Sequence, residues 1–235
     1  MSENIKEFYN EFANKQIATG VNLRHYYLFR KIIQSGLKRN HNVLEIGCGI
    51  GTLTGLLARY LKRGKILAAD ISPENIKIAK ERLKNRKNVE FLISDMQDFQ
   101  HHTKFDFVVL ADVLEHIPRQ HHVVLFQTIS RHMTEDAVLF INIPHPKNIE
   151  YLEKYLPEKL QIVDQALYAN EIITAAFQNG LILNQYVSYK LYHKEKDYIT
   201  IQFEKDKFVS YNSLMKKNII LKKIKYRLYY WIFRF

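Results

Sequence analysis

Short apolar runs alternate with segments of helical periodicity, and this alternation restricts the fold of the 235-residue chain more than any other feature. The apolar runs predict strands over residues 42–46, 65–70, 89–94, 105–110 and 137–143. The segments between and after them predict helices over residues 51–63, 73–86, 118–133 and 166–179. Strands that are apolar along their whole length and are joined by helices form a parallel sheet that is covered on both faces.

The pattern changes after residue 180. The apolar runs 181–192 and 198–203 flank a polar loop that has no room for a helix, so they predict an antiparallel hairpin. The expected fold is therefore α/β, with a Rossmann-like sheet of seven strands and helices on both faces. The sheet is expected to be mostly parallel, with one antiparallel strand from the C-terminal hairpin. Residues 1–40, which precede the first strand, predict two further helices.

The positive charge of the chain is concentrated at its C-terminal end. Of the 35 basic and 24 acidic residues, residues 205–235 contain nine basic residues and a single acid, Asp206. The rest of the chain is nearly balanced, which makes a nucleic-acid surface over the body of the protein unlikely. Cys48 is the single cysteine, so no internal disulfide can form, and a reducing, cytoplasmic location is expected.

The most informative segment is VLEIGCGIGT, residues 43–52, in which a predicted strand enters a loop containing Gly47, Gly49 and Gly51. Glycines at such a turn let a ligand approach the backbone and leave amide N–H groups free to bind it. Asp70 stands at the end of the next predicted strand. A carboxylate at that place can accept hydrogen bonds from both hydroxyls of a ribose.

A glycine loop alone does not distinguish between nucleotide-binding enzymes, because NAD-type oxidoreductases have one too. Their spacing requires glycine or alanine where this chain has Thr52. Glu45, within the preceding strand, would repel a pyrophosphate but suits a cationic ligand. The oxidoreductase is therefore the weaker alternative. A binding protein that keeps the fold without catalysis is the other alternative, and the intact glycine loop and acid count against it.

Two further segments, FLISDM at residues 91–96 and FDFVVLADVLEHIP at residues 105–118, complete a pattern. With VLEIGCGIG and Asp70, they resemble the motifs of class I S-adenosylmethionine-dependent methyltransferases. The DVLEHIP run is similar to that of small-molecule methyltransferases of the ubiquinone-biosynthesis type. The resemblance implies S-adenosylmethionine as cofactor and methyl transfer to oxygen or nitrogen of a small, lipid-like or aromatic acceptor. It also implies an N-terminal helical lid over residues 1–40 and a methyltransferase domain over residues 41–204.

The resemblance also implies which residues contact the cofactor. These are Glu45, Gly47, Cys48, Gly49, Gly51, Asp70, Ile71, Asp95, Met96 and Ala111, with Tyr9 and Arg24 from the N-terminal helices. Glu45 would face the ammonium group, Asp70 the ribose, Ile71 and Met96 the adenine faces and Asp95 the adenine amine. Ala111 would offer a backbone group near the methionine part, and Tyr9 and Arg24 would meet the carboxylate. Ile71 and Met96 could equally be core residues, and the two lid residues could belong to a packed amphipathic helix.

Two histidines are candidate general bases, should the acceptor have to lose a proton. His116 follows the fourth predicted strand and His145 the fifth, at the edge of the sheet where ligands bind. For His116 the alternatives are that it caps a helix or forms a hydrogen bond within the loop, and Glu115 could equally be the polar residue that faces the site. For His145 the alternative is that the prolines around it merely stiffen a loop. The pairs His101-His102 and His121-His122 do not predict a metal site, because adjacent side chains point apart.

Residues 205–235 are expected to contain a basic, aromatic helix. Leucines and aromatic residues are interleaved there with lysines, which is typical of a helix lying on a membrane surface. A peripheral location at the inner face of the membrane is one interpretation. Docking on the chain's own domain or on a second subunit, and contact with RNA, are the alternatives. The oligomeric state is left open.

Overall fold

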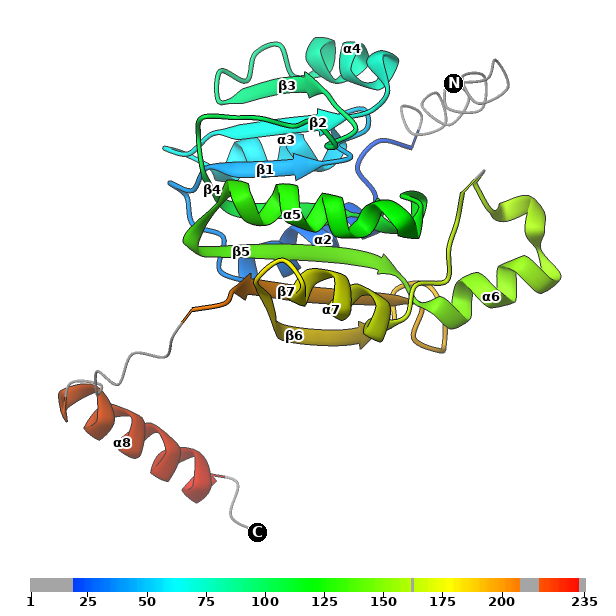
Figure 1. Cartoon of the computed structure of the whole chain (residues 1–235). Helices are drawn as coiled ribbons and strands as arrows, with labels where there is room; N and C mark the ends of the chain where they lie inside the picture. Colours follow the sequence, from blue (N-terminus) through cyan, green and yellow to red (C-terminus); the bar gives the residue numbers. More distant parts are fainter. Residues whose placement is uncertain (1–18, 162, 208–215, 233–235) are drawn as a thin grey trace.

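The computed structural model describes residues 19–161, 163–207 and 216–232 (Figure 1). Seven strands form one sheet in the order β3-β2-β1-β4-β5-β7-β6. The strands are β1 (Val43–Ile46), β2 (Ile66–Asp70), β3 (Val89–Ile93), β4 (Phe105–Ala111), β5 (Met133–Pro144), β6 (Leu181–Tyr189) and β7 (Tyr198–Lys205). β7 pairs antiparallel with both β5 and β6, and the neighbouring pairs among β1 to β5 are parallel. The predicted fold is confirmed.

Helices cover both faces of the sheet. The α-helices are α2 (Leu23–Gln34), α3 (Thr52–Tyr60), α4 (Pro73–Arg82), α5 (His122–His132), α6 (Pro146–Tyr155), α7 (Ala169–Phe177) and α8 (Lys216–Ile232). Three short 3₁₀ turns are η1 (Leu114–His116), η2 (Arg119–His121) and η3 (Pro157–Lys159). α5 and α7 lie over one face and α2 and α3 over the other (Figure 1).

Two apolar cores follow from the alternation of side chains along each strand. In β4, Val108 and Leu110 belong to the core under α5 and α7, whereas Phe107 and Val109 belong to the core under α2 and α3. All four side chains are fully buried. Burial on both faces explains why this strand reads as one continuous apolar run.

The carboxyl ends of β1, β2 and β4 meet at one edge because these strands are parallel and in register. Ile46 pairs with Ala69 on one side and with Leu110 on the other. The loops that follow the three strands therefore share that edge, where open α/β sheets bind their ligands.

The N-terminal region contains one described helix. α2 buries Leu28 and Ile32 in the core beside α3, and its N-cap is Asn22. Part of the predicted lid over residues 1–40 is thus packed onto the sheet. The expected first helix, and Tyr9 within it, lie outside the described residues.

Towards the other end of the chain, α8 extends away from the sheet (Figure 1). Its side chains from Asn218 to Ile232 are all exposed. Within the described ranges, no helix has the length and apolar character needed to cross a membrane.

Candidate functional site

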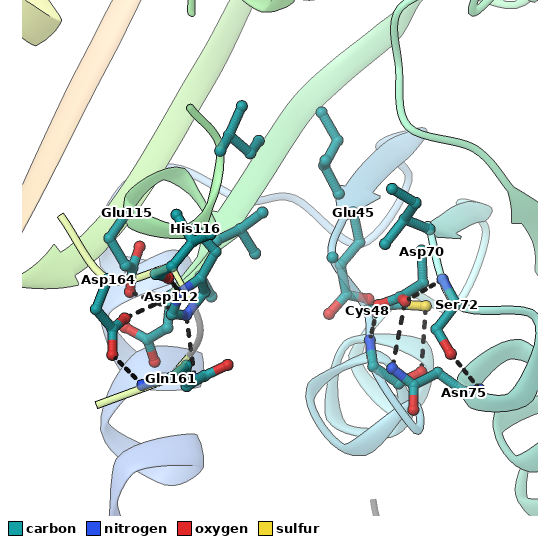
Figure 2. Close-up of a pocket in the computed structure, with 18 of the residues that line it drawn as sticks. Glu45, Cys48, Asp70, Ser72, Asn75, Asp112, Glu115, His116, Gln161 and Asp164 are labelled. Carbon is teal, nitrogen blue, oxygen red and sulfur yellow. Dashed lines mark hydrogen bonds and ion pairs between the residues drawn. The ribbon is translucent and has the colours of Figure 1, made fainter. Parts of the chain in front are cut away.

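A cavity of about 1100 Å³ lies over the carboxyl ends of the central strands. Its walls come from the loop after β1, the β2–α4 junction, the loop after β3 and the segment after β4, with α2 and α6 at its sides. Figure 2 shows the polar residues in two groups, one around Asp70 and one around His116. The crevice predicted from the glycine loop is therefore open space lined by polar side chains.

The glycine loop forms one wall of the cavity. Gly47 (φ +74°) and Gly49 (φ +52°) both have left-handed backbone conformations and both line the cavity. A Cβ on Gly47 would lie 2.2 Å from Cγ2 of Val113, so no side chain fits there. Glycine is required at this position both by the backbone angle and by the close approach of the segment after β4.

Gly51 does not line the cavity, unlike Gly47 and Gly49, and its contact with a cofactor stays a prediction. It is the N-cap of α3 with φ +77°. A Cβ at this position would lie 3.0 Å from Cδ1 of Leu83 and 3.2 Å from Cβ of Ala79. Gly51 therefore permits the start of α3 to pack closely against α4.

Asp70 faces the cavity and forms hydrogen bonds with the loop after β1 and with the β2–α4 junction. Its Oδ2 accepts a hydrogen bond from the Gly49 backbone N–H at 2.7 Å. Its Oδ1 accepts one from the Ser72 N–H at 2.9 Å and a longer one from the Asn75 side chain at 3.3 Å. A carboxylate has about four acceptor positions, so Asp70 keeps one for a ligand and gains a second if Asn75 turns away.

Glu45 and Cys48 are buried at the base of the cavity. Oε2 of Glu45 has no hydrogen-bond partner among the described residues, and burial raises the pKa of this carboxyl to about 8. Burial also raises the pKa of the Cys48 thiol, which makes it a packing residue and not a nucleophile. Both residues line the cavity, as predicted for the cofactor site.

The three residues that were predicted to bind adenine, Ile71, Asp95 and Met96, all line the cavity. Ile71 is 51% exposed and lines the cavity, so it is free to pack against a flat ring. Met96 also lines the cavity but is 2% exposed and belongs to the core, with φ +67°. Asp95 is exposed, and its Oδ1 accepts a hydrogen bond from the Gln97 N–H at 3.0 Å.

A buried polar network supports the opposite wall. Arg24 forms an ion pair with Asp112 at 2.7 Å, and Asp112 has φ +58°. The Asn142 side chain donates to Asp112 at 2.7 Å, and the Tyr189 hydroxyl donates to Asn142 at 2.7 Å. Arg24 and the neighbouring Ala111 line the cavity, in agreement with the sequence prediction, and Arg24 is held by Asp112.

His116 lines the cavity, and its ring nitrogen Nδ1 has two acceptors close by. Its Nδ1 donates to the Val163 backbone oxygen at 2.6 Å and lies 3.0 Å from Oδ1 of Asp164. Burial would lower the pKa of His116, but the hydrogen bond to Asp164 and the charge of Glu115 outweigh burial and raise it to about 9. Nδ1 of His116 is thus engaged by Val163 and Asp164, and the role of His116 as a general base stays a prediction.

Replacing Asp164 with asparagine is expected to lower the pKa of His116, because the substitution removes the charge that stabilises the imidazolium. In the wild type, the folded-state pKa of about 9 lies above the ordinary 6.5. Protonation therefore stabilises the fold fully below pH 6.5, and this contribution is lost as the pH rises through about 9. NMR titration of the ring protons measures the pKa, with the exposed Glu158→Gln as control. An unchanged value in Asp164→Asn would contradict the assignment.

His145 is removed from the site. It is the N-cap of α6, and its Nδ1 accepts a hydrogen bond from the Lys147 backbone N–H at 3.2 Å. It does not line the cavity. Its ring is used to begin a helix, and the role of His145 as a base or substrate contact stays a prediction.

Several site residues were not predicted from the sequence. They include Ser72, Asn75, Gln97, Asp112, Gln161 and Asp164. Asp112 lies within the run that follows β4, so its position at the ligand edge was a usable signal. Glu115, in the same run, also lines the cavity, and the sequence had offered it as a polar residue facing the site. Nothing near Asp164 in the sequence indicates a site. No group of three or more His, Cys, Asp or Glu side chains in the described parts of the chain could hold a metal ion.

The strand order, the glycine loop after β1 and the acid at the end of β2 define the fold of class I methyltransferases. Residues 43–136 match the family model described as a methyltransferase domain. N-methyltransferase NodS from Bradyrhizobium japonicum, solved with S-adenosyl-L-homocysteine, has this fold as well. The two structures agree with a TM-score of 0.62 at 20% sequence identity, over 78% of this chain and 86% of that chain.

Sequence relatives match over shorter stretches. Malonyl-acyl-carrier-protein O-methyltransferase 1 of Ilyobacter polytropus is 32% identical over 78 residues, which is 33% of this chain and 29% of the relative. (S)-coclaurine N-methyltransferase of Thalictrum flavum is 29% identical over 107 residues, which is 45% of this chain and 29% of the relative. The chain thus spans less than a third of the length of these two relatives.

Proposed function

We propose that the protein is an S-adenosylmethionine-dependent methyltransferase that acts on oxygen or nitrogen of a small acceptor. The observation that carries this proposal is an open cavity with bare backbone at Gly47 and Gly49 and with Asp70 facing in from the next strand. A nucleoside with an amino-acid end needs both features, one for its chain and one for its sugar.

In the proposed complex, each wall contacts one part of S-adenosylmethionine. Asp70 accepts hydrogen bonds from the ribose, and Ile71, Asp95 and Met96 bind the adenine. Glu45 faces the ammonium group across the glycine loop. Arg24 binds the carboxylate, because the guanidinium keeps donors that Asp112 does not use. Tyr9, outside the described residues, is proposed to close over the same end.

Methyl transfer from a sulfonium ion needs little chemical assistance, since the leaving group is already activated. The chain's contribution is to align the acceptor with the methyl group and to exclude water. Apolar side chains beyond the polar groups offer a surface for an apolar or aromatic acceptor, namely Ile117, Leu125, Ile149 and Leu152. The likeness of the DVLEHIP run to the ubiquinone-biosynthesis type supports such an acceptor, and the relatives named above carry both O- and N-methyltransferase names.

Calorimetric titration with S-adenosylhomocysteine tests the proposal directly. Saturable binding of one molecule per chain is expected, with no binding of NADH. Transfer of labelled methyl groups from S-adenosylmethionine to a cell extract then separates an enzyme from a binding protein. A folded chain that binds no S-adenosylhomocysteine would refute the cofactor, and binding without any transfer would favour the non-catalytic alternative.

We also propose that α8 binds an anionic membrane surface. At the α-helical repeat, six of its apolar residues lie on one side, namely Ile220, Leu221, Ile224, Leu228, Trp231 and Ile232, whereas Ile219 lies outside this side. The remainder of the surface carries Lys222, Lys223, Lys225 and Arg227 with tyrosines between them. These side chains are exposed, and residues 207–235 contain no acid. An amphipathic helix of this composition lies in the plane of a bilayer interface.

Flotation with liposomes tests this second proposal. The full chain is expected to float with vesicles of phosphatidylcholine and phosphatidylglycerol but not with phosphatidylcholine alone. Each basic residue near an anionic surface contributes about 1 kcal/mol, so replacing Lys222, Lys223 and Lys225 with glutamine should reduce partitioning roughly 10²-fold. A chain that ends at residue 210 should not float. Equal flotation of that chain would contradict the proposal.

A further inference from the structure

Two buried carboxyl groups in the cavity lack a partner for one oxygen. Oε2 of Glu45 and Oε2 of Glu115 form no hydrogen bond with any described residue. Glu45 is 2% exposed and Glu115 is 1% exposed, and both line the cavity. Figure 2 shows that they belong to different groups, Glu45 beside Asp70 and Glu115 beside Asp112, His116 and Asp164. Each is thus a separate place for a ligand.

A buried carboxylate is expensive when the protein offers no hydrogen bond to replace its lost hydration. Glu115 is nevertheless held rigidly in this position. Its backbone oxygen accepts hydrogen bonds from the Gln165 backbone N–H at 3.2 Å and from the Gln165 side chain at 3.0 Å. The backbone oxygen of Glu115 therefore has its hydrogen bonds, whereas Oε2 of the side chain has none. We infer that a ligand supplies the missing partner of Oε2.

Two of the basic side chains that line the cavity with Glu115 are already paired. Arg24 pairs with Asp112 at 2.7 Å, and His116 lies 3.0 Å from Asp164 and only 3.9 Å from Oε1 of Glu115. Lys159 also lines the cavity, but from the exposed turn η3. Oε2 of Glu115 therefore has no hydrogen-bond donor among the described residues. It lies in a part of the cavity that holds the three carboxyl groups of Asp112, Glu115 and Asp164 (Figure 2).

S-adenosylmethionine has a single ammonium group, and in the proposed complex this group lies against Glu45. The cofactor therefore has no second ammonium group that could pair with Glu115. We propose that Glu115 binds the acceptor, that the acceptor is an amine, and that Glu115 takes the proton the amine must lose. This inference rests on the proposed methyltransferase function and narrows its acceptor to one chemical class. A carboxylate acceptor is disfavoured at the same place, because it would meet the like charges of Asp112, Glu115 and Asp164.

The reaction balances with no further reactant. The ammonium form of the acceptor binds to the Glu115 carboxylate and transfers one proton to it, which leaves a neutral amine and a carboxylic acid. The nitrogen lone pair then forms a bond to the methyl carbon as the bond from carbon to sulfur breaks. That electron pair stays on sulfur, so the products are S-adenosylhomocysteine and a methylated ammonium ion. Glu115 afterwards releases its proton to solvent.

The raised pKa of Glu115 suits a group that takes a proton from an ammonium ion. Burial raises the pKa of its carboxyl to about 8, against a partly compensating charge on His116. A base is most effective when its pKa lies near the pH at which the enzyme works. A carboxylate of this kind can deprotonate an ammonium ion, whereas the proton of an aliphatic hydroxyl is far too weakly acidic for it.

The class of the acceptor can be tested on the wild-type chain. The small-molecule fraction of a cell extract is divided, and the primary and secondary amines of one half are acetylated. Both halves are incubated with protein and S-adenosylmethionine that carries a trideuterated methyl group. Incorporation into metabolites is expected to fall at least tenfold in the acetylated half. Equal incorporation in both halves would overturn the inference while leaving the methyltransferase function intact.

The role of Glu115 is tested by Glu115→Gln, which keeps the shape of the side chain and removes its charge. Transfer should fall at least ~10²-fold, the usual contribution of a positioned base. The affinity for S-adenosylhomocysteine should stay within about twofold, because Glu115 does not belong to the cofactor group. Glu153→Gln, an exposed carboxylate outside the cavity, is the control and should transfer normally. Undiminished transfer by Glu115→Gln would overturn the assignment.

Discussion

Asp70→Asn is expected to weaken the binding of S-adenosylhomocysteine by at least ~10²-fold. The substitution removes the charge behind two hydrogen bonds to the ribose, and hydrogen bonds to a charged group contribute about 1.5–3 kcal/mol each. It also places an amide donor where the Gly49 and Ser72 N–H groups donate in the wild type. One of these backbone donors would lose its acceptor, so the glycine loop would move.

Calorimetry measures this loss, and circular dichroism checks that the variant is folded. Asp98→Asn is the matched control, because Asp98 is exposed and does not line the cavity. It should bind S-adenosylhomocysteine as the wild type does. If Asp70→Asn bound equally well, the carboxylate would not hold the sugar, and the placement of the whole cofactor would have to be abandoned.

Gly47→Ala is expected to destabilise the fold by about 2–5 kcal/mol. A left-handed conformation costs a residue with a Cβ about 1–2 kcal/mol, and a forced contact in a packed interior costs about 1–3 kcal/mol. The contact is with Cγ2 of Val113, 2.2 Å from the added atom. In a chain of this size the midpoint of thermal unfolding should fall by roughly 5–15 °C.

Two further variants separate the two contributions. Gly180→Ala adds a Cβ at φ +68° with nothing within 4 Å, so it should show the cost of the backbone angle alone. The double variant Gly47→Ala, Val113→Ala removes the collision and should recover the part of the loss that Gly180→Ala does not show. Thermal unfolding of all three gives the comparison. If Gly47→Ala were no worse than Gly180→Ala, the close approach of Val113 would have no energetic consequence.

The fold could be predicted because its determinants are local. Each central strand is apolar on both faces, each helix has its own periodicity, and the hairpin has too short a loop for a crossover. The ends of elements were less predictable. β5 begins at Met133 and not at residue 137, because Met133 pairs with Phe105 across a register shift in the sheet.

The site was predictable only where it is made of contiguous sequence. Gly47, Gly49 and Asp70 lie close to the strand ends that position them, and the structure brings all three into the cavity. The packing role of Gly51 could not be predicted, because its neighbours Ala79 and Leu83 belong to α4 and its C-cap. The ion pair of His116 could not be predicted either, because Asp164 comes from a loop with no motif of its own.

The contacts that hold Asp112 in place determine how far the chain can be truncated without loss of the site. The recognised homologous stretch ends at residue 136, yet Asp112 is held by Asn142, and Asn142 by Tyr189 on the sixth strand. Arg24, the fourth member of this chain of contacts, precedes the stretch. The part of the chain that the site needs is therefore longer than residues 43–136. A fragment or chimera limited to these residues would keep the glycine loop. It would lose Arg24, Asn142 and Tyr189, which hold Asp112 in the opposite wall of the cavity.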